Sequence, residues 1–258
     1  MIPYSLEGLV ALVTGASRNI GIGAAIAREL AMGGADLFLA YYQPYDQSMS
    51  WGIEPGEPEH LLAELQGLGV RADGLELDLG AVGSAPRLFD AAEASLGPIN
   101  ILVNNATVSE PGGIFQVDAA QLDRHYAVNI RNLVLLSAEF ARRLPPGTPG
   151  RIINLSSGQS AGPMPGEIAY VTTKGGVEAF TLSASLELAS QGITVNAIDP
   201  GVTDTGWMSP ELKEELTRRA PMGRVGMPAD AARLVRFLAT REAGWITGQL
   251  IRSRGGLG

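Results

Sequence analysis

Residues 9–23 read LVALVTGASRNIGIG, an apolar run that passes into a glycine-rich turn. Residues 9–14 are apolar at nearly every position, which is typical of a strand buried on both faces of a sheet. Gly15, Gly21 and Gly23 allow a sharp turn and a close approach to the start of the helix that we expect at residues 24–32. This order of strand, turn and helix predicts a site for the pyrophosphate of a dinucleotide.

The same alternation of apolar strands and helical patterns continues along the chain. Further strands are expected at residues 35–40, 74–77, 99–103, 151–155, 193–198 and, as a short one, 249–252. Helical patterns occupy residues 57–68, 84–96, 119–143, 170–190 and 229–238. Apolar strands separated by helices indicate a parallel sheet covered on both faces. Because no linker interrupts the pattern, we expect one α/β domain over residues 1–258, a Rossmann-type doubly wound sheet of about seven strands.

Two segments depart from this alternation. Residues 43–58 contain three prolines and are expected to form a long loop, a feature that is often functional in compact domains. Residues 201–226 follow the sixth expected strand and include a short polar helix at residues 210–219. Because ligands of such sheets bind beyond the carboxyl ends of the strands, we expect a substrate lid there. Surface decoration is the alternative.

The composition excludes several classes of protein. The 258 residues carry a net charge of −8, which argues against a nucleic-acid partner, because such proteins usually present a basic face. Cysteine is absent, which excludes disulfides and thiol catalysis, and two histidines are too few for an ordinary histidine metal site. The sequence has no apolar run long enough to predict a membrane span, and residues 1–8 do not read as a signal peptide. We expect a cytoplasmic enzyme without a metal.

Tyr170 and Lys174 lie four residues apart in an expected helix, so both side chains project from one face. A tyrosine is a weak proton donor at neutral pH, because its reference pKa is about 10. A neighbouring ammonium favours the phenolate, so we expect Lys174 to lower the pKa of Tyr170 and to ease proton transfer. Ser157 is placed to hold a substrate oxygen beside the phenol. The set predicts acid/base chemistry on a carbonyl or an alcohol.

Polar residues also follow the third and fourth expected strands. Asp78 and Leu79 end the third strand, and Asn104, Asn105 and Ala106 end the fourth. Each group alone would fit a capped turn. Together with the glycine-rich turn they mark three strand ends at one edge of the sheet, where one dinucleotide would meet them all.

The combined pattern resembles the classical short-chain dehydrogenase/reductase family over essentially the whole chain. The stretch PMGRVGMP at residues 221–228 is similar to the 3-oxoacyl-[acyl-carrier-protein] reductase branch in particular. The matching pieces are residues 14–23, Asp78, Asn104-Asn105-Ala106, Asn129, Ser157, Tyr170-x-x-x-Lys174, Pro200-Gly201-x-x-x-Thr205 and Thr247-Gly248.

The resemblance implies a role for each catalytic position. Tyr170 would be the general acid in carbonyl reduction and the base in the reverse reaction, and Lys174 would lower its pKa and bind the nicotinamide ribose. Ser157 would orient the substrate carbonyl, with Ser156 the weaker candidate. Asn129 would hold a water that extends the proton path from Lys174. The cofactor-binding residues would be Gly15, Ser17, Arg18, Gly21, Ile22, Tyr41, Asp78, Leu79, Asn105, Ala106, Tyr170, Lys174, Pro200, Gly201 and Thr205.

The chain departs from the family pattern at several points. Five residues separate Gly15 from Gly21 where the family has three, an expansion similar to the enoyl-reductase branch. That branch spaces its tyrosine and lysine more widely, so the spacing here favours reduction of a carbonyl over reduction of a carbon–carbon double bond. Thr107 replaces the glycine of the family's Asn-Asn-Ala-Gly, and the C-terminal stretch RSRGG at residues 252–256 replaces the commoner Val-Asp-Gly-Gly.

The choice of cofactor depends on the end of the second strand. Family members that use NAD carry an aspartate there, whereas this chain has Tyr41. Without that carboxylate a 2′-phosphate is not repelled, and Arg18 offers it a positive partner. We therefore favour NADP(H). NAD(H) remains the alternative, with Asp46 as a substitute acid.

Several alternatives concern substrate and assembly. The substrate would be a 3-oxoacyl thioester or another ketone; an NAD-dependent alcohol or sugar dehydrogenase is the main alternative. An inactive dinucleotide-binding protein and an extended-branch epimerase or dehydratase are disfavoured. The resemblance also implies a homotetramer. An acyl-carrier protein would meet Arg124, Arg131, Arg142 or Arg143. Expected substrate-lining residues are Thr107, Val108, Gln159, Met164, Pro165, Trp207 and Met208.

Overall fold

The computed structural model describes residues 4–256 of the chain. Its seven strands form one parallel sheet in the order β3-β2-β1-β4-β5-β6-β7, which confirms the expected doubly wound α/β fold. The order reverses between β1 and β4, which creates the crevice where such sheets bind ligands. The strands are β1 (Val10–Thr14), β2 (Asp36–Tyr41), β3 (Ala72–Glu76), β4 (Ile101–Asn104), β5 (Gly150–Leu155), β6 (Ile193–Asp199) and β7 (Leu250–Arg252).

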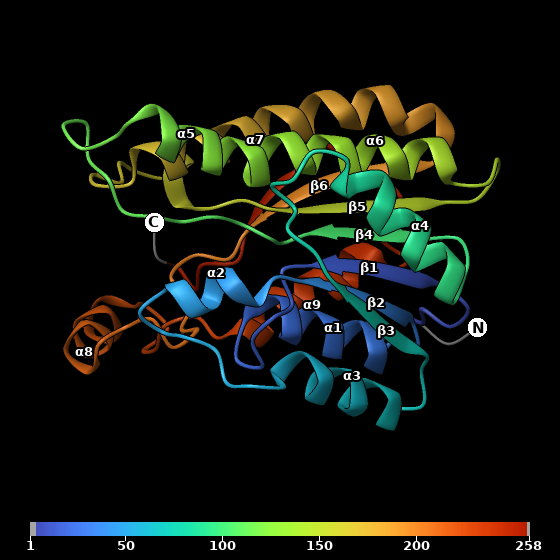
Figure 1. The fold of residues 1–258 in the computed structure, drawn as a ribbon, viewed down its shortest axis with the longest axis horizontal. Helices are drawn as coiled ribbons and strands as arrows, with labels where there is room; N and C mark the ends of the chain where they lie inside the picture. Colours follow the sequence, from blue (N-terminus) through green and yellow to red (C-terminus); the bar gives the residue numbers. More distant parts are fainter. Residues whose placement is uncertain (1–3, 257–258) are drawn as a thin grey trace.

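Helices cover both faces of the sheet (Figure 1). On one face, α1 (Ile22–Met32), α3 (Glu57–Gly67) and α9 (Pro228–Ala239) bury their apolar side chains in one core. On the other face, α4 (Ser84–Leu96), α6 (Leu133–Arg143) and α7 (Ile168–Leu188) form a second core. The central strands are buried along their whole length, which explains their continuous apolar sequence. No helix within residues 4–256 is long and apolar enough to cross a membrane.

The expected loop at residues 43–58 is partly helical, which corrects the sequence prediction. Helix α2 (Gln43–Ser48) begins directly after β2, with Pro44 in its first turn, a position where proline is compatible with a helix. With only six residues and no buried side chain, α2 is too short to give a periodic signal. Figure 1 places α2 and α8 (Pro210–Arg219) beyond the carboxyl edge of the sheet.

The expected helix at residues 119–143 is also not continuous. It divides into α5 (Ala119–Tyr126), a π-helical turn at Ala127–Asn132, and α6. A π-turn inserts one extra residue into the helical ladder and is frequent at functional sites. Asn129 lies within this turn, so the interruption coincides with a residue that the sequence assigns to the site.

Most other boundaries agree with the sequence to within two residues. The third strand starts earlier than expected, at Ala72, because it lies at the edge of the sheet and exposes Asp73 and Glu76. Its apolar run is therefore shorter than the strand itself. Helix α7 likewise begins at Ile168, one half-turn before Tyr170.

The end of β1 is fastened to the end of β4 through Thr14. The Thr14 hydroxyl accepts hydrogen bonds from the backbone N–H groups of Asn105 and Ala106, at 3.0 and 3.1 Å. The Asn105 side-chain amide donates to the carbonyl oxygens of Thr14 and Gly15, both at 2.9 Å. At Gly15, where φ is +72°, a Cβ would lie 2.7 Å from the Cα of Ala106. Only glycine permits this contact between two strand ends.

Substitution of Gly23 tests whether the fold depends on this close packing of the glycine-rich turn against Asn105. In Gly23→Ala the new Cβ would overlap the carbonyl oxygen of Gly15 and lie 2.8 Å from the Asn105 amide nitrogen. Because the backbone must shift, we expect the free energy of unfolding to fall by about 1–3 kcal/mol. Gly67→Ala in α3, where a Cβ meets nothing within 4 Å, is the matched control and should not destabilise the fold. Chemical denaturation measures both; equal stability of the two variants contradicts the prediction.

Candidate active site

A cleft of about 1690 Å³ follows the carboxyl edge of the sheet. It runs from the glycine-rich turn after β1, past the ends of β2, β3 and β4, to the segments that follow β5 and β6. It therefore opens at the strand-order reversal where the fold predicts a ligand. Of the expected cofactor residues, fourteen line it: Gly15, Ser17, Arg18, Gly21, Ile22, Tyr41, Asp78, Leu79, Asn105, Ala106, Tyr170, Pro200, Gly201 and Thr205.

The glycine-rich turn fits a pyrophosphate. Helix α1 begins there with Gly21 as its N-cap, without a side-chain cap and without an acidic residue in its first turn. Its first N–H groups are thus left for a ligand, and the helix dipole favours an anion. Any side chain at Gly15 or Gly23 would fill the space against the neighbouring backbone. The geometry suits the dinucleotide expected from the sequence.

The four expected catalytic residues come together at the other end of the cleft. Ser157 and Tyr170 line its wall, whereas Asn129 and Lys174 lie behind that wall and are only 2 and 3% exposed. Lys174 is therefore an internal support of the site, and only the phenol and the hydroxyl face the space where a substrate would lie.

Lys174 is buried with one direct hydrogen-bond partner. Its Nζ donates to the backbone carbonyl oxygen of Leu155 at 2.7 Å and lies 5.6 Å from the centre of the Tyr170 ring. Burial disfavours the ammonium and lowers the pKa of Lys174 to about 8. This contact fixes α7 on the end of β5, so that Tyr170 stands beside Ser157.

The phenol of Tyr170 differs from the sequence prediction. Burial raises the pKa of Tyr170 to about 12, and the nearby Ser157 hydroxyl lowers it by less. The expected lowering by Lys174 is not found: after burial and Ser157, the groups that act on the phenol are Glu167, Asp199 and Tyr45, and all three raise its pKa. The phenol is thus fully protonated at neutral pH.

All the hydrogen-bonding capacity of the Asn129 side chain is taken up by other protein groups. Its amide nitrogen donates to the carbonyl oxygen of Val108 at 2.9 Å and to the Thr173 hydroxyl at 3.0 Å. Its oxygen accepts from the N–H of Val108 at 2.7 Å and from the Thr107 hydroxyl at 3.1 Å. An amide has two donors and two acceptor sites, so none is left for the expected water. The side chain instead anchors the segment after β4 to α7.

Ser156 lines the cleft, but its hydroxyl and the Gln159 amide are both engaged by Glu178. The Ser156 hydroxyl donates to Glu178 at 2.9 Å, and the Gln159 amide donates to the same carboxylate. This arrangement explains why Ser156 is the weaker candidate. Of the expected substrate-lining residues, the cleft includes Thr107, Val108, Met164 and Trp207 but not Gln159, Pro165 or Met208.

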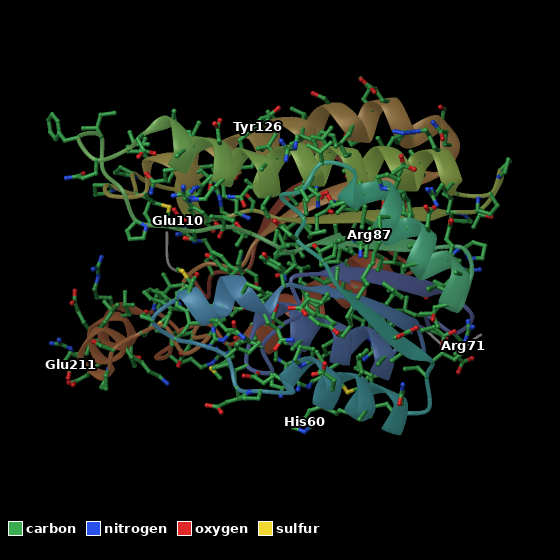
Figure 2. All side chains as sticks on the ribbon, in the orientation of Figure 1. His60, Arg71, Arg87, Glu110, Tyr126 and Glu211 are labelled. Carbon is green, nitrogen blue, oxygen red and sulfur yellow. The ribbon has the colours of Figure 1, made fainter. Side chains whose placement is uncertain are left out.

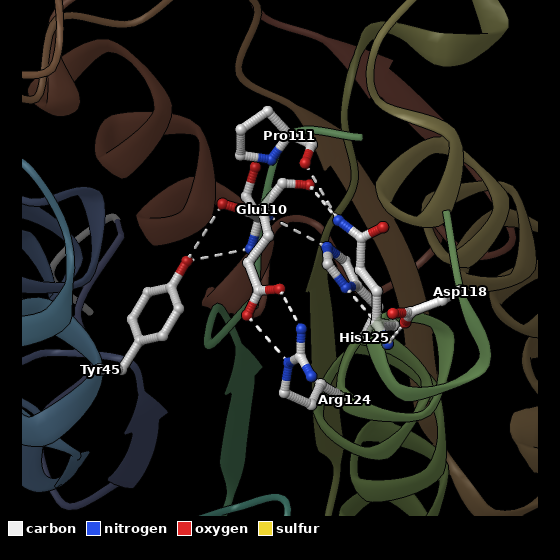
Figure 3. Close-up of polar contacts among 8 residues, drawn as sticks. Tyr45, Glu110, Pro111, Asp118, Arg124 and His125 are labelled. Atoms are coloured by element: carbon white, nitrogen blue, oxygen red, sulfur yellow. Dashed lines mark hydrogen bonds and ion pairs between the residues drawn. The ribbon is translucent and has the colours of Figure 1, made fainter. Parts of the chain in front are cut away.

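Tyr45 of α2 forms a hydrogen-bonded contact across the cleft that the sequence did not predict. The Tyr45 hydroxyl accepts from the N–H of Ser109 at 3.0 Å and lies 3.4 Å from its carbonyl oxygen (Figure 3). The next residue, Glu110, pairs with Arg124 at 2.7 Å, and its N–H donates to Nε2 of the buried His125 at 3.1 Å. The segment after β4 is thus held from both sides. Because α2 has no sequence signal, this contact could be found only in the structure.

Two charged residues also line the substrate end of the cleft, which the sequence predicted to be apolar or neutral. Glu167 precedes α7, and burial raises the pKa of its carboxyl. Arg254 follows β7 and forms an ion pair with Asp199 at 3.4 Å. Within residues 4–256 no group of histidine and carboxylate side chains could hold a metal ion.

Comparison with known proteins assigns this arrangement to a family. The model of the family described as "Enoyl-(Acyl carrier protein) reductase" matches residues 15–258. An uncharacterized oxidoreductase of Bacillus subtilis, YjdA, is 45% identical over 249 residues, 96% of each chain. The chain belongs to the short-chain dehydrogenase/reductase family. As a short-chain dehydrogenase/reductase, it is an oxidoreductase of a family that binds NAD(P).

Two further relatives of this short-chain dehydrogenase/reductase have more specific names. The 3-oxoacyl-[acyl-carrier-protein] reductase FabG of Staphylococcus aureus is 34% identical, over 96% of this chain and 97% of its own. The crystal structure of the angucycline C-6 ketoreductase LanV with bound NADP superposes with a TM-score of 0.86 at 36% identity, covering 98% of this chain and 96% of that one. The fold and the site thus have ketoreductases among their relatives.

The buried ammonium of Lys174 gives a prediction about stability. Its pKa of about 8 lies below the value of about 10.5 in the unfolded chain, so the folded state binds fewer protons between these pH values. The cost of burying the charge is complete below pH 8, declines as pH rises, and is absent above the unfolded value. Lys174→Met should therefore be more stable than the wild type at pH 7 by on the order of 3 kcal/mol, a gain that shrinks towards pH 10.5.

Unfolding by urea at several pH values measures this difference. Lys213→Met is the matched control, because Lys213 is the only other lysine, is half exposed, and pairs with Asp204 on the surface. Its effect should not follow this pH course. A Lys174→Met variant whose difference from the wild type is independent of pH contradicts the account.

Proposed function

We propose that the protein is an NADP(H)-dependent oxidoreductase that reduces a ketone to a secondary alcohol, or catalyses the reverse reaction. The observation that carries the proposal is the placement of Ser157 and Tyr170 together on the cleft wall, with Lys174 buried behind them. A hydroxyl and a protonated phenol at one point of a cleft suit a carbonyl oxygen that must accept a proton. An NAD-dependent alcohol or sugar dehydrogenase is the alternative.

The chemistry is divided between cofactor and protein. The nicotinamide cofactor supplies the hydride when it is bound. Ser157 and Tyr170 hold the carbonyl oxygen by hydrogen bonds, and the Tyr170 phenol gives its proton to that oxygen. With a pKa of about 12 the phenol is protonated at neutral pH, as the acid that donates to a carbonyl oxygen must be.

Lys174 and Asn129 act behind the reacting groups. By the family resemblance, the ammonium of Lys174 would stabilise the phenolate that remains after proton transfer and bind the nicotinamide ribose, although its Nζ lies behind the cleft wall here. With a pKa lowered to about 8, Lys174 also lies near the range in which it can exchange a proton. Asn129 keeps α7 and the segment after β4 in register, and a water on the proton path would bind its backbone.

Tyr170→Phe tests the proposed acid. The substitution removes the donor and little else, so kcat for ketone reduction should fall by about a hundred- to ten-thousandfold. The dissociation constant of the cofactor, measured by fluorescence titration, should stay close to that of the wild type. Tyr4→Phe, at a half-exposed position outside the cleft, is the control and should keep full activity. Substantial turnover by Tyr170→Phe would mean that another acid donates the proton.

The preference for NADP(H) is supported by Arg18. Its guanidinium lines the cleft beside the end of β2, stacks 5.6 Å from the centre of the Trp51 ring, and donates to no acceptor among the described residues. The competing acid, Asp46, is already engaged, because it accepts from the Trp51 indole at 3.2 Å. Burial also raises the pKa of Asp46. A free guanidinium and an engaged carboxyl favour a 2′-phosphate over a 2′-hydroxyl.

Arg18→Ala should separate the two cofactors. Loss of a hydrogen-bonded ion pair predicts a fall in kcat/KM for NADPH of about 10- to 100-fold, with little change for NADH. Arg87→Ala, an exposed arginine of α4 outside the cleft, is the matched control (Figure 2). Steady-state kinetics with each cofactor give the answer, and a wild type that prefers NADH would overturn the assignment.

A free ketone suits the cleft better than a thioester on an acyl-carrier protein. Such a carrier is acidic and needs unengaged basic residues near the entrance. Arg124 is paired with Glu110, and Arg143 with Asp90, Glu93 and Glu139. Arg131 lines the cleft and has no ion pair among the described residues, but it is bonded to the carbonyl oxygen of Gly80 and is a single charge. We therefore place a small carbonyl compound first. Residues 201–226 would act as its lid, since Trp207 and Thr205 line the cleft.

The proposed assembly is a homotetramer. Leu182 and Leu186 on α7 are 65 and 82% exposed, and Trp245 in the C-terminal segment is 99% exposed. Side chains of this kind gather on faces that another subunit covers.

Light scattering should give four times the 27.0 kDa mass of the chain, and a mass of 27.0 kDa would refute the proposal. Leu186→Lys should dissociate the assembly, whereas Leu68→Lys, at an exposed position directly after α3, should not.

A further inference from the structure

Arg254 is a charged residue at the substrate end of the cleft that the proposed mechanism does not use. It follows β7, its side chain is 14% exposed, and it lines the cleft together with Ser157, Tyr170 and Gly201. Its Nε and Nη1 are buried without a hydrogen-bond partner among the described residues. The remaining nitrogen, Nη2, is not buried and forms no hydrogen bond with residues 4–256. One donor group thus faces the cleft.

Two glycines make room for this side chain. A Cβ at Gly158 would lie 2.9 Å from Nη2 of Arg254. A Cβ at Gly201 would lie 3.0 to 3.2 Å from the Cγ, Cα and Cβ atoms of the same residue. Gly158 directly follows Ser157, so the guanidinium stands against the backbone next to the hydroxyl that would hold the substrate carbonyl. A substituent of a substrate held at Ser157 would therefore lie near this guanidinium.

Asp199 balances the charge of Arg254, but the guanidinium nitrogens form no hydrogen bonds with the described residues. Asp199, fully buried at the end of β6, lies 3.4 Å from Nε, and the two groups lack hydrogen-bond geometry. Asp199 Oδ1 accepts instead from the N–H of Gly201 at 2.9 Å. The carboxylate therefore holds the inner side of the guanidinium and leaves its outer edge to a ligand. A loosely paired buried arginine is costly unless further hydrogen bonds satisfy it.

We propose that Arg254 binds a carboxylate of the substrate, so that the substrates are short oxo acids whose carboxylate lies close to the ketone. This inference rests on the proposed function and names its substrate class. The Nη2 group can donate a charge-assisted hydrogen bond to a carboxylate oxygen. A doubly charged phosphate ester is less suited, because Asp199 already balances the charge of Arg254. In the reaction the hydride adds to the ketone carbon, the Tyr170 proton goes to its oxygen, and the carboxylate is unchanged.

The test compares matched acids and esters. The wild type is assayed with NADPH and with 2-oxo, 3-oxo and 4-oxo acids, each beside its methyl ester, which has the same ketone without the charge. At least one acid should be reduced with a higher kcat/KM than its ester. In Arg254→Gln, kcat/KM for that acid should fall about 10- to 100-fold while the value for the ester stays within about twofold, the loss expected for one charged hydrogen bond.

A second variant tests the same prediction if Arg254→Gln is unstable, and a third is the control. The double variant Arg254→Gln/Asp199→Asn removes both buried charges and should show the same selective loss. Arg252→Gln is the matched control, since this exposed arginine of β7 lies outside the cleft, and it should leave both substrates unaffected. Circular dichroism and the melting temperature confirm that each variant is folded.

The outcomes separate this inference from the proposed function. If the wild type reduces esters as well as or better than every acid, or if the Arg254 variants lose both equally with a raised KM for NADPH, Arg254 serves the fold or the cofactor and the inference is wrong, while the proposed function stands. If the wild type reduces no ketone of the panel, the proposed function fails and the inference with it.

Discussion

The buried hydrogen bond between the Lys174 ammonium and the carbonyl oxygen of Leu155 is the interaction on which the site depends. It joins the last residue of β5 to the second turn of α7, and so places Tyr170 beside the segment that carries Ser157. The protein stabilises this charge poorly by itself, since burial lowers the pKa of Lys174 to about 8. A buried cation kept at such a cost is characteristic of functional sites, where stability is given up for a group that acts in the reaction.

The rest of the molecule orients the two halves of the cleft around that contact. At the cofactor half, the Thr14 hydroxyl and the Asn105 amide fasten β1 to β4, which sets the shape of the glycine-rich turn. At the substrate half, Asn129 in its π-turn and Tyr45 of α2 hold the segment after β4 from opposite sides. Each of these groups forms at least one hydrogen bond with backbone atoms of the segments that follow the strands, which fixes the strand ends where a ligand would bind.

Periodicity and motif spacing predicted the sheet, most helices and the meeting of Ser157 with Tyr170, because these features are local or follow from a parallel topology. The sequence did not predict α2, which is too short for a periodic signal, or the π-turn, which leaves the apolar pattern almost unchanged. The pKa of Tyr170 was expected to fall, whereas burial raises it. The spacing of residues along the chain does not predict how deeply a side chain is buried, and the cost of desolvation depends on that burial. Arg254 was visible as a departure from the family ending, but only the structure brings it to the cleft.

Tyr170 and Lys174, four residues apart on one helix, are proposed to serve the reduction of a carbonyl and not of a carbon–carbon double bond, although the glycine-rich turn is expanded as in the enoyl-reductase branch. An α,β-unsaturated ketone offers both bonds in one molecule, and NMR of the product formed with NADPH identifies which is reduced. The expected product is the allylic alcohol, with the double bond retained. A saturated ketone, with the carbonyl retained, would contradict the proposal.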